Sequence, residues 1–404
     1  MTRPDVGRDA LASRLDQALA GLPAPPSTPV VVVDLDAFDA NADDLVRRAA
    51  GKPIRVASKS VRVPELLRRA LRHDGFHGIL SYTLREALWL HREGFSDDIV
   101  VAYPTVDRVA LAELTESPDA LQAITLMVDD PAHLDLIDHA RTASSPVRVA
   151  VDIDAGLRIG GQHVGPKRSP LYDTDAVVDL VRGISARPGL SLVGVMTYEG
   201  QVAGLPDAVP SQRARSLVIR RLKAASQSQL EGRRTEIRAA IRDLADLEFW
   251  NAGGSGSIDS TTTDPAVTEI AAGSGLLVPG LFDHYQAFDP QPAAFFGVPV
   301  VRRPSAQLIT VHGGGFIASG AAGKDRLPIP WAPSGLHLTG LEGAGEVQTP
   351  VTGPGAARLR IGDLVWFRHA KSGELFEHTN RLLLLTGADI VDEVPTYRGC
   401  GLVF

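Results

Sequence analysis

Cysteine is almost absent from this chain of 404 residues, which has a single one, Cys400. One thiol cannot build a disulfide framework within the chain, so we expect a reducing compartment. The sequence has no run of about 18 apolar residues, the length that crosses a bilayer. Residues 1–29 also lack the apolar stretch of a signal peptide. These absences predict a cytoplasmic protein with no membrane partner.

An excess of positive charge is missing too. The chain has 41 lysine and arginine residues against 48 aspartate and glutamate residues, and its formal net charge is −7. This balance argues against a general nucleic-acid partner. The hydrophobic fraction of 44% is that of a globular protein with a sizeable core. The length fits a large domain joined to a smaller one.

Short apolar runs rich in β-branched residues alternate with helical patterns from residue 30 to about residue 275. Eight such runs begin near residues 30, 54, 78, 98, 123, 147, 190 and 248. Strands that alternate with helices pair in parallel, because each crossover helix returns the chain to the same end of the sheet. Eight of them predict a closed (β/α)₈ barrel.

The pattern changes after about residue 275, where strand patterns are separated by glycine, proline and aspartate turns. We therefore expect an N-terminal extension over 1–28, the barrel over 29–275 and a β-rich C-terminal domain over 276–404. The connection 211–248 carries many arginines at helical spacing and is predicted to form a long helix or a helix pair. A solvated charged face and a phosphate or partner site both fit this connection.

The second predicted strand ends in the segment RVASKS, residues 55–60. In barrels of this kind, catalytic groups lie at the carboxyl ends of the strands. Strand alternation puts Lys59 on the same face as Ala57, so Lys59 points into the barrel mouth if Val56 faces the outer helices. The same register turns Arg55 inward near the bottom of the barrel, which is unusual for a charged side chain.

Polar groups also follow three later strands. Arg158 stands in a glycine-flanked loop after the sixth strand, and the seventh ends in the polar segment 197–201. The eighth leads into Gly-Gly-Ser-Gly-Ser at 253–257, where successive glycines free backbone N–H groups to converge on an anion. A lysine, an arginine and such a loop at the ends of one set of strands suit pyridoxal 5′-phosphate, which binds through a lysine and its phosphate.

Four motifs carry a resemblance to a known family: RVASKS at 55–60, DAGLRIGG at 154–161, NAGGSGS at 251–257 and FRHAKSGEL at 367–375. The chain resembles the fold-type III pyridoxal-phosphate enzymes, in which an alanine-racemase-like barrel precedes a β domain. Within that group it is similar to the D-threonine aldolase and D-serine dehydratase branch, over the chain from about residue 28. The resemblance implies D-configured substrates and a homodimer in which the β domain of one subunit completes the active site of the other.

The resemblance also implies roles for individual residues. Lys59 forms the Schiff base with the cofactor, Arg158 lies near the phenolic oxygen of the cofactor, and Tyr198 lines its ring. Glu199 and Gln201 are weaker candidates as partners of the ring nitrogen or of the substrate. The phosphate is expected to bind to five consecutive residues: Gly253, Gly254, Ser255, Gly256 and Ser257.

The C-terminal motif departs from the family pattern. In the aldolase and dehydratase relatives, a histidine and a cysteine or aspartate two residues later bind a divalent metal. Here His369 is retained, but Lys371 stands at the second position, where its ammonium would repel a metal ion. We therefore doubt the metal and expect Lys371 to stabilise a leaving hydroxyl or to bind a substrate carboxylate. His369 is the expected ligand if a metal is bound.

Other polar residues near the C-terminal domain have less defined roles. Asp283 and Tyr285 follow the exit from the barrel, and by the resemblance they approach the active site. Glu374, Glu377 and His378 form either a different metal site or ordinary surface charge.

Together these features predict a pyridoxal-phosphate-dependent lyase for a β-hydroxy amino acid. Lys59 takes the α-proton, and His369 handles the proton of the β-hydroxyl. Dehydration with deamination and retro-aldol cleavage both stay open, since they use the same electron sink. The alternatives are a racemase with Lys371 or Tyr285 as second base, a non-catalytic cofactor-binding protein, and a barrel that binds another anion. In the implied dimer, His369 and Lys371 act near Lys59 of the partner subunit.

Overall fold

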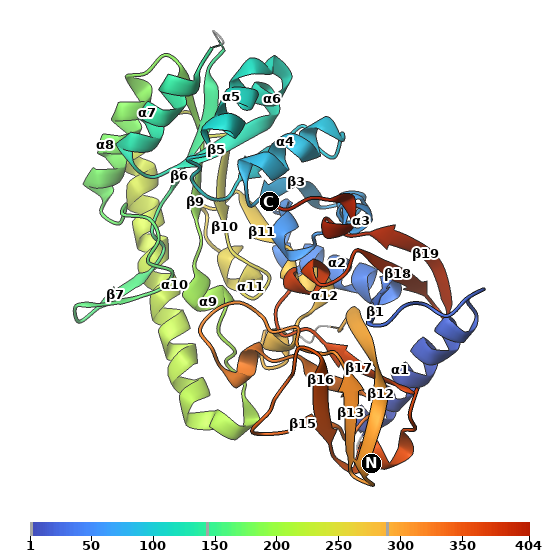
Figure 1. Cartoon of the computed structure of the whole chain (residues 1–404). Coiled ribbons are helices and arrows are strands. Elements are labelled where there is room, and N and C mark those ends of the chain that lie inside the picture. The colour runs from blue at the N-terminus through green and yellow to red at the C-terminus, as the bar shows by residue number, and fades with distance from the viewer. Residues whose placement is uncertain (1–2, 143–144, 288–290) are drawn as a thin grey trace.

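The computed structural model describes residues 3–142, 145–287 and 291–404. The chain forms a closed barrel of eight strands and, beside it, a nine-stranded sheet built mainly from C-terminal strands (Figure 1). The predicted fold class, a (β/α)₈ barrel followed by a β-rich region, is confirmed. No helix in the described ranges is long and apolar enough to cross a membrane.

The barrel strands are short apolar segments that pair in parallel around a closed ring. Side chains from successive strands fill the interior, among them Val100, Met127, Ala150 and Phe249. In barrel order the strands are β10 (Phe249–Ala252), β11 (Glu269–Ala272), β2 (Ile54–Ala57), β3 (Phe76–Ser81), β4 (Ile99–Val101), β5 (Ile124–Val128), β6 (Val147–Asp152) and β9 (Leu190–Thr197).

Polar residues at strand ends start several of the outer helices. The Asp34 carboxylate accepts hydrogen bonds from the N–H groups of Asp36 (3.2 Å) and Ala37 (3.3 Å). Thr83 accepts one from the N–H of Glu86 (3.1 Å). These caps satisfy N–H groups that the first turn of a helix leaves unpaired. The helices along the barrel are α2 (Leu35–Ala49), α3 (Pro64–Leu71), α4 (Leu84–Arg92), α5 (Arg108–Glu116), α6 (Pro118–Ala123), α7 (Pro131–Ala140), α8 (Thr174–Ser185), α9 (Gly200–Ala203), α10 (Arg213–Ile241), α11 (Ile258–Thr261) and α12 (Ser274–Leu277).

One of the eight predicted barrel strands lies elsewhere. β1 (Val30–Asp34) is a central strand of the nine-stranded sheet, where it pairs antiparallel with β12 and parallel with β18. The ring is closed instead by β11, between β10 and β2. The four valines of β1 are buried on both faces of their sheet. A buried barrel strand has the same composition, so the sequence pattern does not distinguish the two places.

The nine-stranded sheet packs one face against an N-terminal helix, α1 (Arg3–Ala20). Leu15 and Leu19 of α1 share a buried cluster with Val32 and Trp366. The predicted boundaries 1–28, 29–275 and 276–404 stay a prediction. Besides β1, the sheet contains β12 (Ala294–Ser305), β13 (Leu308–His312), β14 (Ile329–Ala332), β15 (His337–Leu338), β16 (Gln348–Thr352), β17 (Leu364–Arg368), β18 (Arg381–Thr386) and β19 (Asp389–Pro395).

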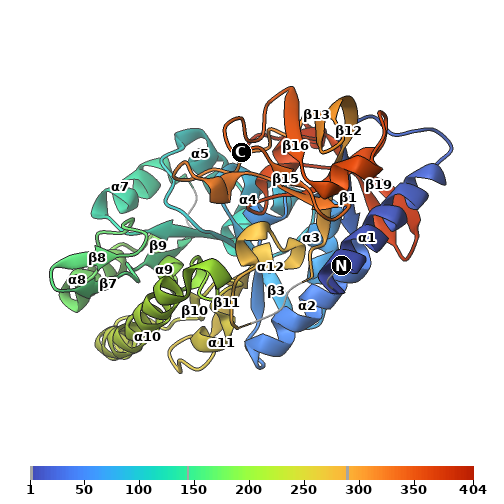
Figure 2. The ribbon, with the colours of Figure 1, turned by 90° about the horizontal axis from the view of Figure 1, so that it is seen from below.

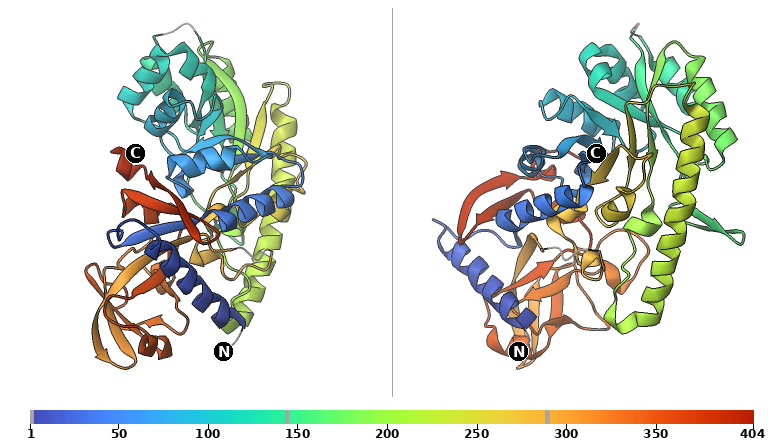
Figure 3. Two further views of the ribbon diagram at one scale, coloured as in Figure 1. Left: turned by 90° about the vertical axis from the view of Figure 1, so that its right-hand side faces the viewer. Right: turned by 180° about the vertical axis from the view of Figure 1, so that it is seen from behind.

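The arginine-rich connection folds as one helix, α10, of 29 residues. It runs along the outside of the barrel next to α8 (Figures 2 and 3). Arg213, Arg215 and Arg221 are exposed, whereas Arg234 is buried on the inner face of the helix. The exposed arginines fit a solvated face, and the buried one has a role at the candidate site described below.

Arg55 points into the barrel, where two carboxylates meet it. Its guanidinium donates to Glu269 through Nε and one terminal nitrogen, each at 2.9 Å, and to Asp98 at 2.7 and 2.9 Å. Glu269 also accepts a hydrogen bond of 2.8 Å from the side chain of Asn251. Burial alone would lower the pKa of Arg55, but the two carboxylates hold it above its usual value. The inward register is therefore stabilised by charge pairing inside the barrel.

We expect Arg55→Met to lower the free energy of unfolding by about 3 kcal/mol, because it leaves Glu269 buried without its counter-charge. The measurement is a urea titration of the cofactor-free protein. The matched control is Arg182→Met on exposed α8, whose partner Asp179 lies 3.6 Å away at the surface. This control should change stability by less than about 0.5 kcal/mol. Equal effects of the two variants would contradict a structural role of the Arg55 pair.

Candidate active site

A cavity of about 310 Å³ lies at the carboxyl ends of the barrel strands. Residues at the ends of most of the barrel strands line it, together with six residues of the chain that follows the barrel: Pro279, Leu281, Phe282, Tyr285, Lys371 and Ser372. Active sites of (β/α)₈ barrels lie at this end. The ionisable and amide side chains on the cavity wall are Lys59, Tyr82, Tyr103, Asp152, Asp154, Arg168, Tyr198, Asn251, Tyr285 and Lys371.

Lys59 reaches the cavity from a single 3₁₀ turn, Ser58–Ser60, that directly follows β2. Its Nζ donates a hydrogen bond of 2.6 Å to the hydroxyl of Tyr103, a residue in the loop after β4. The neighbouring Ser58 is buried, and its hydroxyl donates to the carbonyl oxygen of Leu80 (3.2 Å). Lys59 therefore lies in the barrel mouth, where the strand register places it.

The loop 253–257 lies on the cavity wall and can be built only with glycine at two positions. Gly253 has φ +83°, and a Cβ on Gly256 would stand 2.3 Å from the carbonyl oxygen of Ala203. Within the described part of the chain, the backbone N–H groups of Ser255 and Gly256 donate to no protein acceptor. Such free N–H groups in a turn are the donor set that binds a phosphate.

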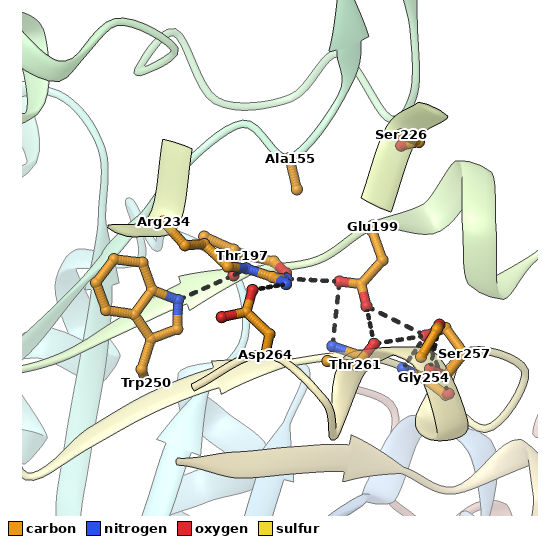
Figure 4. Close-up of polar contacts among 12 residues, drawn as sticks. Ala155, Thr197, Glu199, Ser226, Arg234, Trp250, Gly254, Ser257, Thr261 and Asp264 are labelled. Carbon is orange, nitrogen blue, oxygen red and sulfur yellow. Dashed lines mark hydrogen bonds and ion pairs between the residues drawn. The ribbon is translucent and has the colours of Figure 1, made fainter. Parts of the chain in front are cut away.

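Glu199 lies behind this loop rather than in the cavity (Figure 4). Its carboxylate accepts hydrogen bonds from the N–H of Gly253 (3.2 Å) and the hydroxyl of Ser257 (3.2 Å), and also from the hydroxyl of Thr261. Arg234 of α10 pairs with the same carboxylate at 3.1 Å. Glu199 and Ser257, expected to contact the cofactor, thus support the loop from behind.

Arg234 connects Glu199 to two further residues of the barrel. It also pairs with Asp264 at 3.0 Å and donates to the Thr197 hydroxyl at 2.9 Å. Gln201 is likewise turned away from the cavity, and its amide donates to the carbonyl of Ala155 and the hydroxyl of Ser226, both at 2.7 Å. The predicted substrate contacts of Glu199 and Gln201 are therefore replaced by internal hydrogen bonds.

Arg158 does not reach the cavity in this structure. It lies on a hairpin, β7 (Leu157–Ile159) and β8 (Gln162–Val164), that projects from the barrel (Figure 1). Its guanidinium stacks on Tyr172 with 3.5 Å between the guanidinium carbon and the ring centroid. Arg168, ten residues further along in the same connection, lines the cavity instead and lies 5.8 Å from the Tyr103 ring. The hairpin carries the side chain of Arg158 outward, which the sequence did not indicate.

The sequence analysis gave no role to several residues of the cavity wall, among them Tyr103, Asp152 and Arg168. Tyr103 and Asp152 stand in the runs DIVVAYP and VRVAVDID, so their place at strand ends was a signal that could have singled them out. Arg168 stands in a loop with no strand pattern, and its direction depends on how the hairpin folds back. For that residue the sequence held no comparable signal.

Burial and neighbouring charges shift the pKa values of several groups in the cavity. Burial, and then the charge of Asp129, raises the pKa of Asp152 to about 8, so this carboxyl is largely protonated at neutral pH. Burial, and then Glu199, raises the pKa of Tyr198 to about 12. For Tyr103, burial is outweighed by the charges of Lys59 and Arg168, which together hold its pKa below the usual value.

The C-terminal motif approaches Lys59 within the same chain. Lys371 and Ser372 line the cavity, and the Lys371 ammonium donates to the Ser319 hydroxyl at 3.0 Å. His369 is buried next to Ser372, with 3.3 Å between its Nε2 and the Ser372 hydroxyl oxygen. Burial, and then the charge of Arg368, lowers the pKa of His369 to about 3. The motif thus approaches Lys59 of its own chain, and its expected action near the partner subunit's Lys59 stays a prediction.

Asp283 and Tyr285 have separate surroundings. Asp283 pairs with the buried Arg368 at 2.7 Å, away from the cavity wall. Tyr285 lines the cavity, and its hydroxyl donates to the carbonyl oxygen of Ala203 at 2.8 Å. Only Tyr285 of this pair is therefore placed to contact a bound molecule.

The acidic residues after Lys371 do not gather around one point. Glu374 accepts a hydrogen bond from the N–H of Ser319 (2.9 Å), Glu377 pairs with Arg62 (2.6 Å), and His378 stacks on Phe316. Among the residues that the structure describes, no group of three or more His, Cys, Asp or Glu side chains is placed to hold a metal ion.

A family model described as the alanine racemase N-terminal domain matches residues 33–258. The chain belongs to this family. The match spans β2 to β10 of the barrel and includes Lys59 and the glycine loop. The resemblance drawn from RVASKS and the other motifs is thereby confirmed.

Proteins similar to this chain include aldolases and a dehydratase. Two 3-hydroxy-D-aspartate aldolases of Paracoccus denitrificans are 26% and 24% identical over 253 residues, which is 61% of this chain and 59% of each relative. A D-threonine aldolase from Filomicrobium marinum has a TM-score of 0.75 at 20% identity, covering 93% of this chain and 97% of its own. D-threo-3-hydroxyaspartate dehydratase from Delftia sp. HT23 has a TM-score of 0.71 at 19% identity, covering 94% and 98%. The likeness to the two solved structures extends the shared fold through the C-terminal sheet.

The protonated Asp152 carboxyl makes stability depend on pH. The folded chain keeps a proton that the unfolded chain has released, so this group disfavours folding increasingly as pH rises from 3.8, its ordinary pKa, to about 8. We expect Asp152→Asn to gain stability over wild type by about 1.4 kcal/mol per pH unit in this window. Urea titrations of the cofactor-free proteins at pH 5, 6 and 7 measure the gain.

The control for this prediction is Asp179→Asn, which removes an exposed carboxylate of α8. Its stability relative to wild type should stay flat over the same pH range. A flat difference for Asp152→Asn as well would show that this carboxyl ionises in the folded chain as it does in the unfolded one.

Proposed function

We propose that this protein is a pyridoxal-phosphate-dependent lyase for D-configured β-hydroxy amino acids. The observation that carries the proposal is one cavity lined by both the Lys59 ammonium and the free N–H groups of the glycine loop. A lysine beside a phosphate-binding turn is the donor set that this cofactor needs. The names of the relatives, aldolases and a dehydratase of hydroxylated D-amino acids, support the reaction class and the substrate class.

The residues present fit the cofactor. Ser255 and Gly256 would hold the phosphate through their N–H groups, and Lys59 would form the covalent link. Tyr198 and Asn251 line the space between, and Arg168 and Asp152 are the charged and titratable groups beside it. Bound pyridoxal phosphate supplies an electron sink when a bond to the amino-acid Cα breaks.

The residues of the chain would then manage protons and orientation. Lys59 would be placed to take a proton from the substrate as general base. His369 contacts Ser372 on the cavity wall and is neutral at physiological pH; its lowered pKa makes it a weak base, so we propose that it orients the β-hydroxyl through the Ser372 hydroxyl as a hydrogen-bond partner. Dehydration and retro-aldol cleavage both use this arrangement, and we propose both as candidate outcomes. The homodimer and the cytoplasmic location are proposals of the same kind.

Racemase activity is the second candidate, because Lys371 supplies a second amine on the cavity wall. The other proposed second base, Tyr285, is held by Ala203, and burial raises its pKa above the usual value. Following α-proton exchange together with release of ammonia or aldehyde separates a racemase from a lyase.

We further propose that Lys371 replaces a metal ion. A D-threo-3-hydroxyaspartate dehydratase has been solved with a cysteine changed to alanine, in a metal-free form, and also with a change at a histidine two positions earlier. This chain has His369 and Lys371 at that spacing. Burial and the neighbouring Lys59 lower the pKa of Lys371, against the opposing charge of Glu374. An ammonium at this place attracts a substrate carboxylate or a leaving hydroxyl.

Wild-type protein mixed with pyridoxal phosphate should develop the near-visible absorbance of lysine-linked cofactor, and Lys59→Ala should lack or alter it. Borohydride reduction followed by peptide mapping should place the label on Lys59. The control Lys324→Ala, at an exposed lysine, should keep the band. Assays with D- and L-β-hydroxy amino acids then identify keto acid with ammonia, or aldehyde with glycine. A wild type without any band in excess cofactor would overturn the cofactor assignment.

Lys371→Met should raise KM for a substrate with a side-chain carboxylate by about tenfold, the loss of one charge-assisted hydrogen bond. The KM for a neutral hydroxy amino acid should change less, and Lys371→Arg should preserve the preference. Chelator treatment should leave wild-type activity unchanged. A metal content near one ion per chain, lost in His369→Ala, would contradict the replacement of the metal by Lys371.

A further inference from the structure

Tyr103 is the residue that makes direct contact with the reactive lysine. It stands in the loop after β4, and its hydroxyl oxygen lies 2.6 Å from the Nζ of Lys59. The guanidinium carbon of Arg168 lies 5.8 Å from the ring of Tyr103, on the same cavity wall. The phenol is therefore the acceptor of the lysine hydrogen bond and the near neighbour of a second cation.

The groups that face Tyr103 come from four segments and are mostly cationic. Lys59 comes from the turn after β2, Arg168 from the loop before α8, and Lys371 from the segment after β17; all three favour a negative phenol oxygen. Tyr198, after β9, is the neutral neighbour. Asp152 faces Arg168 rather than Tyr103 and is itself largely protonated at neutral pH. An anionic phenol is thus the natural counter-charge for these cations.

Lys59 needs such a partner when it acts as a base. A lysine amine that takes a proton becomes an ammonium, and this one would form beside Arg168 and Lys371 on the wall of the same cavity. These three groups carry the same charge and repel one another. The phenol oxygen of Tyr103, in hydrogen-bond contact with Lys59, offsets this repulsion and can also accept the proton.

We propose that Tyr103 is the proton partner of Lys59: its phenolate stabilises the ammonium that Lys59 forms on taking the substrate proton, and then accepts that proton. In this step the Nζ–H bond breaks and the phenolic O–H bond forms, so ammonium and phenolate become amine and phenol with no change in total charge. Lys59 thereby returns to the amine it needs to release the product. The second half of this proposal rests on the proposed function, but the pairing of Tyr103 with Lys59 does not.

The pairing can be tested in the cofactor-free protein, because the chain has only 6 tyrosines. Burial raises the pKa of Tyr82, Tyr198, Tyr285 and Tyr397, so these four ionise late in a titration. The ultraviolet absorbance of phenolate, followed as pH rises, should include an early step from Tyr103. This early step should vanish in Tyr103→Phe and persist in the control Tyr172→Phe, which alters the ring that stacks with Arg158.

Two further variants test whether the neighbouring cations lower the pKa of Tyr103. Lys59→Met should move the early step to higher pH, since it removes the strongest charge acting on the phenol, and Arg168→Gln should move it by a smaller amount. An early step that stays in place in Lys59→Met, or that survives in Tyr103→Phe, would overturn the pairing. Tyr103→Phe keeps the aromatic ring, so loss of the fold is not expected, and circular dichroism checks it.

The role in turnover is tested on the loaded protein. Tyr103→Phe should keep the absorbance band of the lysine-linked cofactor, lower kcat roughly 10- to 100-fold and leave KM within about twofold, the pattern of a lost proton acceptor. An unchanged kcat and pH profile would overturn the relay. A wild type without the band would overturn the proposed function instead, and the phenolate titration would still decide whether Tyr103 and Lys59 are coupled.

Discussion

The candidate site depends on one buried carboxylate, that of Glu199. A glycine loop is a poor anion site unless something fixes its backbone, because glycine has the largest conformational freedom of any residue. Glu199 binds the N–H of Gly253 and the hydroxyls of Ser257 and Thr261, so it holds the loop from its inner side. Arg234 supplies the counter-charge that keeps an anion stable in this buried place. The free N–H groups of Ser255 and Gly256 owe their fixed position to this support.

The sequence analysis located the candidate site but did not place every one of its residues correctly. The surroundings of Glu199 show why. Lys59 and the glycine loop follow strands directly, so their direction is set by strand register and by local turn chemistry, both visible in the sequence. Arg158 and Glu199 also follow strands, but a hairpin turns the first outward and an arginine from a distant helix draws the second inward. The direction of such residues is decided by tertiary partners, which a single sequence does not display.

The fold was predictable to a similar degree. Its prediction was wrong for one barrel strand, for a related reason. Alternating strands and helices are enough to indicate a (β/α)₈ barrel, and the barrel is present. The run VVVVDL is apolar on both faces, which suits a barrel strand and a central sheet strand equally. The eighth barrel strand, β11, begins with Glu269, and this charged residue makes the segment look unlike a buried strand in the sequence. Its ion pair with Arg55 inside the barrel accounts for that charge. Local composition thus indicated the barrel, but it missed β11 and did not show which sheet takes β1.

The place of β1 has a consequence for how this protein is made. β1 precedes the whole barrel in the chain, whereas its two neighbours in the sheet, β12 and β18, follow the barrel. The whole barrel is therefore an insertion within the C-terminal sheet, and a cut between the two parts would leave that sheet without its central strand. Until β12 and β18 have been synthesised, the four consecutive valines of β1 lack their native neighbours, and a strand of that kind readily pairs with other chains. The sheet therefore depends on a strand that is synthesised before the whole barrel.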